Sequence, residues 1–196
     1  MNRPSQKAKR TVSRIFWRSK SGQALIEFTG VIVLLLLLIF GAIDFCRAIY
    51  LRQVLVNLSR ETANLEARGT GTTTQEIMTN ALNAAIQEAL PLALDSSNGM
   101  VIVTAVTNNF GSGKKGSTAG FVISQQYTAG TLGASSAIGT GNNNPAWLPV
   151  TSILPSNRTV YVAEVYYHFT PITPVGKFIN AALPKQFYDV AYFSAL

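Results

Sequence analysis

A long uncharged stretch near the N-terminus limits the fold of this chain more than any other feature. Thr29–Ile43 contains no charged residue and includes an unbroken leucine run, which consists of Leu34, Leu35, Leu36, Leu37 and Leu38. As a helix this stretch would be roughly 22 Å long, which is short of the roughly 30 Å hydrocarbon core of a bilayer. Adding Ala24–Ile26 brings it close to a full span. We therefore expect a transmembrane segment at about 24–43, with Glu27 inside it.

Glu27 is an unusual residue at this position, because a charge in hydrocarbon is costly unless another group pairs with it. Gly22 lies five residues before Glu27. A cut after Gly22 would create a new α-amino group at Gln23, and that group would be a natural partner for the carboxylate. The pattern therefore suggests a processing site.

The charge of the chain is concentrated before the apolar stretch. Residues 1–22 hold seven of the 16 lysines and arginines and none of the nine acidic residues, so the rest of the chain is formally neutral. A basic flank on a membrane helix predicts a cytoplasmic N-terminus. Nucleic-acid binding is disfavoured, because the rest of the chain has no basic cluster beyond Lys114 and Lys115.

Two alternatives account for the apolar stretch without processing after Gly22. A secretory signal peptide should end in a small-x-small cleavage site, and Ile43–Arg47 offers none. An ordinary signal anchor explains the basic flank and the apolar run, but it leaves both Gly22 and Glu27 unexplained.

The residues around the basic boundary resemble the processing motif of Flp/Tad-class type IV prepilins. In that motif a glycine is followed by four residues and then Glu-Phe or Glu-Tyr; here the corresponding positions are Gly22, Gln23, Glu27 and Phe28. The proline commonly found a few residues after the glutamate is missing. The resemblance implies cleavage between Gly22 and Gln23 by a prepilin peptidase.

Three further segments resemble the TadE/TadG-like pseudopilins, or minor pilins, of the tight-adherence pilus. Gly41–Ala48 is similar to that family's Gly-x-x-Asp/Glu-Phe-Gly-Arg-Ala segment, although Cys46 replaces a usual glycine. Leu58–Ala63 is similar to its Ala-Ala-Arg-Glu-Gly-Ala stretch, and Val165–Pro171 resembles its strand ending in Phe-x-Pro. By this resemblance Asp44 and Arg47 belong to the assembly helix together with the leucine run.

The resemblance implies a TadE-like subunit of an adhesive Tad pilus. We expect it in a bacterial inner membrane, with the N-terminus in the cytoplasm and the C-terminal domain outside. Its expected partners are prepilin peptidase, other pilin or pseudopilin subunits, the Tad inner-membrane assembly platform and the lipid bilayer. An unprocessed, membrane-anchored extracytoplasmic binding domain is the alternative, with its binding surface on a Gly/Asn-rich loop and on exposed aromatic residues, Tyr166 and Tyr192.

Helical periodicity continues beyond the membrane segment. Apolar or small residues recur at spacings of three and four, at Ala48, Leu51, Leu55, Leu58, Thr62 and Leu65, and this predicts one buried helix face. We expect a single helix from about residue 23 to 68, ended by Gly69. A second helix should begin at Thr73 or Thr74, with Glu76 in its first turn.

From Met100 onward the sequence predicts strands. They are expected at Met100–Thr107, Gly120–Tyr127, Thr159–Thr170 and about Gln186–Ser194. Residues 128–144 are rich in Gly, Ala, Ser and Asn and predict an extended exposed loop. The expected fold is α+β, with a roughly four-stranded antiparallel sheet packed on the long helix and one additional helix. Three regions follow: a leader (1–22), the long helix (23–68) and an extracytoplasmic domain (69–196).

No motif in the chain predicts catalysis or a cofactor. Gly111–Thr118 resembles a phosphate-binding loop, but Ser117 stands where the lysine must be. With one histidine, His168, and one cysteine, Cys46, the chain cannot assemble a His/Cys zinc site in one subunit. We therefore expect neither an enzyme nor a metal protein.

Overall fold

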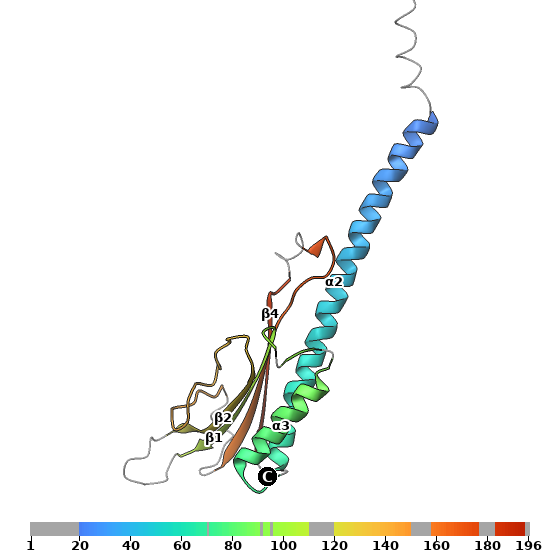
Figure 1. Cartoon of the computed structure of the whole chain (residues 1–196). Coiled ribbons are helices and arrows are strands. Elements are labelled where there is room, and N and C mark those ends of the chain that lie inside the picture. The colour runs from blue at the N-terminus through green and yellow to red at the C-terminus, as the bar shows by residue number, and fades with distance from the viewer. Residues whose placement is uncertain are drawn as a thin grey trace, which may run out of the picture.

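The computed structural model describes residues 20–69, 71–90, 92–94, 96–109, 120–149, 158–176 and 183–194. Two helices precede four strands: α2 (Lys20–Arg68), α3 (Thr74–Glu88), β1 (Gly99–Asn108), β2 (Phe121–Gly130), β3 (Thr159–His168) and β4 (Gln186–Ser194). The strands form one antiparallel sheet in the order β2-β1-β3-β4. The predicted α+β class is confirmed (Figure 1). Residues 1–19, which make up most of the expected basic leader, lie outside the described residues.

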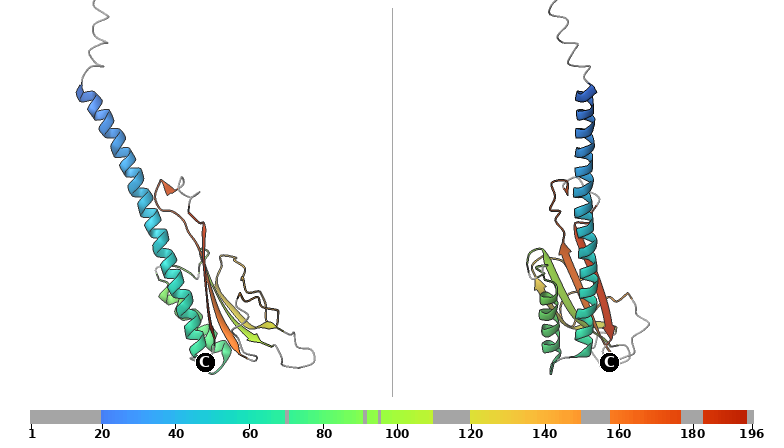
Figure 2. Two further views of the ribbon diagram at one scale, coloured as in Figure 1. Left: turned by 180° about the vertical axis from the view of Figure 1, so that it is seen from behind. Right: turned by 90° about the vertical axis from the view of Figure 1, so that its right-hand side faces the viewer.

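The long helix α2 has two different halves. Its N-terminal half extends beyond the rest of the molecule, while its C-terminal half packs on the sheet (Figures 1 and 2). The predicted stripe is buried on the packed half at Ala48, Leu51, Leu55, Leu58 and Thr62, whereas its last residue, Leu65, is only partly buried. The helix ends as expected at Gly69, whose positive φ of 63° suits a residue without a Cβ.

Both helices cover the same face of the sheet. α2 lies against β3 and β4, and α3 lies against β1 and β2. The main core forms between these layers, where the alternate residues Val101, Val103 and Ala105 of β1 face the helices together with Tyr161 and Val165 of β3. Burial of these apolar side chains is the main force that holds the helices on the sheet.

The other face of the sheet is covered by residues 131–149. The expectation of an extended exposed loop over residues 128–144 is wrong in two respects: residues 128–130 complete β2, and Ile138 is only 1 % exposed. Ile138 and Leu148 cover Val106, Phe121, Val160 and Val162. A strand face with this many apolar residues needs cover, and a few apolar residues in an otherwise polar loop provide it.

The helix α3 begins at a cap that the sequence predicted. Thr73 is the N-cap, and its hydroxyl accepts a hydrogen bond from the Glu76 backbone N–H over 3.2 Å. The Glu76 carboxylate accepts in turn from the backbone N–H and the hydroxyl of Thr72. These hydrogen bonds stabilise the charged form and lower the pKa of Glu76.

Candidate membrane and assembly segment

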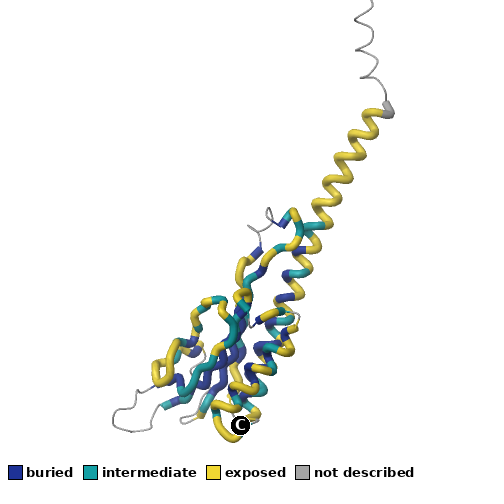
Figure 3. Tube along the Cα trace, in the orientation of Figure 1, coloured by how far each residue is buried: buried dark blue, intermediate teal, exposed yellow. Residues whose placement is uncertain are grey.

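The N-terminal half of α2 presents an apolar surface that no other part of the described chain covers. Every residue from Gly22 to Ile39 is exposed (Figure 3), and the side chains of the leucine run, residues 34–38, are 45–66 % exposed. Exposed apolar area costs about 25 cal/mol per Å² in water, so this surface requires lipid or other apolar helices around it. Among the described residues, α2 is the one helix long and apolar enough to cross a membrane.

The predicted processing residues lie together at the tip of α2. The helix runs without a break through Gly22 and Gln23, and these two residues, Glu27 and Phe28 are all exposed. The Gln23 side-chain amide donates a hydrogen bond of 3.0 Å to the Glu27 carboxylate. Residues four apart on a helix are neighbours, and the geometry therefore places the backbone nitrogen of residue 23 one turn from this carboxylate.

Asp44 and Arg47 lie where α2 reaches the soluble domain, and both bind the segment that follows β3. Asp44 is fully buried; its carboxylate accepts hydrogen bonds from the Ile172 backbone N–H, at 3.0 Å, and from the Thr173 hydroxyl. The Arg47 guanidinium donates to the Thr170 carbonyl over 3.0 Å. The sequence did not predict these contacts.

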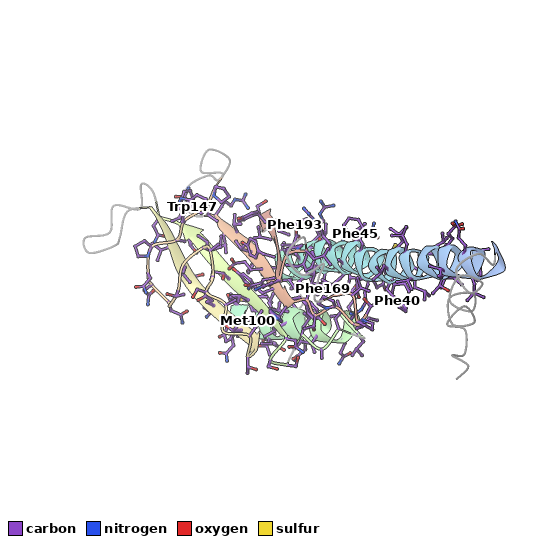
Figure 4. All side chains as sticks on the ribbon, turned by 90° about the horizontal axis from the view of Figure 1, so that it is seen from above. Phe40, Phe45, Met100, Trp147, Phe169 and Phe193 are labelled. Carbon is purple, nitrogen blue, oxygen red and sulfur yellow. The ribbon has the colours of Figure 1, made fainter. Side chains whose placement is uncertain are left out.

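The Arg47 side chain also lies over an aromatic pair at the end of the sheet. Its guanidinium carbon is 5.6 Å from the centroid of the Phe169 ring, a distance typical of a cation–π contact. Phe169 in turn packs edge-to-face on Phe187, with 5.8 Å between ring centroids. Figure 4 shows Phe169 between the long helix and the strands, while Phe40 and Phe45 lie further out along α2.

Further along α2, the segment that resembles the second family stretch packs against β3 and β4. The buried Ser59 hydroxyl donates to the Asp189 carboxylate, and Ala63 packs on Ala163 and Ala191. Small side chains at this crossing allow the helix to approach the sheet closely. These contacts fix the orientation of the domain on the helix.

A buried carboxyl group near the end of α2 was not predicted from the sequence. Glu66 is fully buried, and neither of its carboxyl oxygens has a hydrogen-bond partner among the described residues. Burial disfavours the charged form and raises the pKa of Glu66 well above its ordinary value. Its place four residues after Thr62, on the predicted buried face, was the signal in the sequence.

A further buried carboxylate, Glu164 on β3, lies on the opposite face of the sheet. It accepts hydrogen bonds from the Ser136 hydroxyl, from the Ala137 backbone N–H at 2.8 Å, and from the hydroxyls of Tyr166 and Tyr188 at 3.1 Å each. The pKa of both tyrosines is raised, mainly by their burial and to a lesser extent by the negative charge of Glu164. This cluster fastens the 131–149 loop to the sheet.

The expected pair of exposed aromatic residues is only half right. Tyr166 is buried within the Glu164 cluster, whereas Tyr192 is 36 % exposed. Among the described residues no group of three or more His, Cys, Asp or Glu side chains could hold a metal ion. Cys46 is exposed on α2, His168 ends β3, and Gly111–Thr118 lies outside the described residues.

The described residues form an α+β fold, in which α2 has a protruding apolar N-terminal half and a C-terminal half packed on the sheet. Residues 22–64 match the family model described as TadE-like protein. The matched segment is therefore TadE-like, and it begins at Gly22 and ends within α2. No curated protein and no solved structure matches the chain.

Proposed function

We propose that this chain is a TadE-like prepilin or pseudopilin subunit that is cleaved after Gly22 and takes part in assembly of a Tad-type adhesive pilus. The observation that carries the proposal is the match of residues 22–64 to the TadE-like family, on a helix whose first half is apolar and exposed. A structural subunit needs such a surface for lipid before assembly and for neighbouring helices afterwards.

The proposed topology follows from the charges. The basic leader stays in the cytoplasm, the N-terminal half of α2 spans the inner membrane, and the sheet domain lies outside. Prepilin peptidase cuts between Gly22 and Gln23. The residues of α2 from Gly22 to Ile39 are exposed, so the peptidase can reach the cleavage site, and glycine gives the protease an unencumbered backbone.

Cleavage changes the electrostatics at the tip of the helix. It creates an ammonium group on Gln23, one turn from Glu27. The new amino group of one subunit and the Glu27 carboxylate of its neighbour then form an ion pair. Because desolvation offsets most of the attraction of such a pair, it contributes more to the register of the helices than to stability. The leucine run supplies the remaining, non-directional packing.

The partners of this subunit are prepilin peptidase, other pilin or pseudopilin subunits and the Tad assembly platform. The soluble domain caps or modifies the pilus. In the alternative, an unprocessed anchored binding domain, the exposed half-helix is only an anchor, and exposed aromatic residues such as Trp147, at 65 % exposure, bind a ligand. Processing and filament incorporation distinguish the two.

The test compares processing with assembly in the same cells. Glu27→Ala is expected to be cleaved normally and to be lost from sheared surface filaments, as followed by immunoblotting. Glu27→Asp, which keeps the charge, should retain part of the incorporation. Glu61→Ala is the matched control, because Glu61 is an exposed acid on the same helix. Normal incorporation of Glu27→Ala would remove the proposed role of this carboxylate.

A further inference from the structure

Asp44 marks the outer end of the membrane half of α2. A helix rises about 1.5 Å per residue, so Asp44 lies about 32 Å along α2 from Gln23, and the hydrocarbon core of a bilayer is about 30 Å thick. With Gln23 at the cytoplasmic boundary, Asp44 is at the opposite boundary. This step rests on the proposed function, in which this half of α2 spans the membrane.

The segment 170–176, called here the 170–176 loop, is fastened to α2 at this level. The Asp44 carboxylate accepts hydrogen bonds from the Ile172 N–H and the Thr173 hydroxyl. Arg47 donates one to the Thr170 carbonyl. In both views of Figure 2 the orange-red chain that follows β3 extends beyond the sheet along α2. The loop therefore belongs to the part of the domain nearest to the membrane boundary.

The side chains around this boundary suit the interfacial region of a bilayer. Ile172 in the loop is 65 % exposed, and on the helix Phe45 is 54 % and Tyr50 is 61 % exposed. Aromatic side chains are enriched at the headgroup level, and Arg47 supplies a positive charge for anionic headgroups. The one acidic group here, Asp44, is fully buried and hydrogen-bonded by the loop, so it presents no exposed charge to the lipid.

We propose that the 170–176 loop is a membrane-docking element, which rests on the outer surface of the phospholipid bilayer with Ile172 in the interfacial region. The bilayer is the occupant because exposed apolar side chains recur along α2 as far as Ile43 and Phe45, the two neighbours in sequence of Asp44, which binds the loop. The Asp44 hydrogen bonds have two effects: they shield the carboxylate at the edge of the lipid, and they hold the domain in one orientation on the membrane.

Spin labelling of the full chain in vesicles of phosphatidylethanolamine and phosphatidylglycerol tests this. Cys46→Ser removes the single native cysteine, and nitroxides are then placed at Ile172→Cys or at Trp147→Cys. These two residues have the same exposure, 65 %, so Trp147 is a matched control. Pro174→Cys gives a second exposed position in the loop, and proline has no backbone N–H that could donate to Asp44. Leu36→Cys reports on the membrane helix itself.

The measured quantity is the collision rate of each nitroxide with oxygen and with a water-soluble nickel chelate. Docking predicts that the labels at 172 and 174 collide with the chelate several-fold less often than the label at 147. If the labels at 172 and 174 collide with the chelate as often as the label at 147 while the label at Leu36→Cys is shielded, the loop does not dock, but the proposed membrane helix is supported. If Leu36→Cys is itself open to the chelate, both the docking and the proposed membrane helix fail.

Discussion

The Asp44 carboxylate on α2 accepts hydrogen bonds from Ile172 and Thr173, which lie 128 and 129 residues further along the chain. Asp44 belongs to the segment Gly41–Ala48, and the two groups that donate to it directly follow Val165–Pro171; Arg47 of the first segment donates to the Thr170 carbonyl of the second. The two segments singled out for their resemblance to TadE/TadG-like proteins therefore meet in space. In the proposed topology, the segment that follows β3 therefore lies beside α2 at the membrane boundary.

Asp44→Ala is expected to release the 170–176 loop. The change removes the acceptor from the part-buried Ile172 N–H and Thr173 hydroxyl, at a cost of up to about 1–3 kcal/mol. The Ile172 amide should then exchange its hydrogen faster. The opening free energy calculated from hydrogen exchange in detergent solution should fall by a similar amount. Asp44→Asn retains one acceptor oxygen, so the protection of its Ile172 amide should lie between that of the unmodified chain and that of Asp44→Ala. An Ile172 amide protected as in the unmodified chain would contradict the role given to Asp44.

Gly176→Ala tests the close packing of the same loop in another way. A Cβ at residue 176 would lie 2.2 Å from the Pro171 Cβ and 3.0 Å from the Asp44 Oδ2, so the backbone must shift. We expect lost protection at Ile172 and a lower unfolding temperature. Gly30→Ala is the control, because a Cβ there meets nothing within 4 Å. If the two variants have the same Ile172 protection and the same unfolding temperature, the loop accommodates the methyl group and its packing is not as close as described.

Glu66 makes the stability of the domain depend on pH. Because burial raises its pKa in the folded state, folding is favoured where Glu66 is protonated. Stability falls as the pH rises above the unfolded pKa of about 4.3, by up to about 1.4 kcal/mol per pH unit until the folded pKa is reached. Glu66→Gln cannot ionise and should remove this loss.

Urea unfolding of both proteins across this pH range measures the effect. The other titrating groups contribute equally to the two proteins, so the difference between their unfolding free energies isolates Glu66. The difference should grow in favour of Glu66→Gln as the pH rises. Two profiles that stay parallel would contradict the burial of an ionisable carboxyl group at this position.

Glu164→Gln is expected to lower the pKa of Tyr166 and Tyr188. Burial, which raises both values most, remains, but the negative charge beside the two hydroxyls is gone. Tyrosinate absorbance followed through alkaline pH should show earlier ionisation in the variant. In the folded protein these two pKa values lie above the ordinary value of about 10, so the free energy of unfolding falls as the pH rises above about 10. This loss of stability should be smaller in the variant. Unchanged titration would contradict the contact with Glu164.

The helices and strands were predictable because their patterns are local. The stripe from Ala48 to Leu65 and the alternation in Thr159–Thr170 each record which side chains face the core. The cap at Thr73 and the stop at Gly69 also follow from single residues. The order of strands in the sheet was not predictable, because it depends on pairings between distant segments.

The contacts of the candidate site show the same limit. Gly22 and Glu27 are close in sequence, so a local pattern that resembles the prepilin motif was enough to suggest a processing site. The partners of Asp44 lie on a loop far along the chain, and nothing near Asp44 indicates them. Glu164 and Ser136 meet only because the 131–149 loop folds over the sheet, and a loop of Gly, Ser and Asn gives little sign of that in its sequence.

The N-terminal residue of the mature protein is the most direct evidence for or against cleavage after Gly22. Membrane-extracted protein from cells with and without the prepilin peptidase is sequenced from its N-terminus by mass spectrometry. The proposed function predicts a chain that starts at Gln23 when the peptidase is present and retains the basic leader when it is absent. A chain that still starts at Met1 in the presence of an active peptidase would contradict processing after Gly22, and with it the ion pair proposed for Glu27.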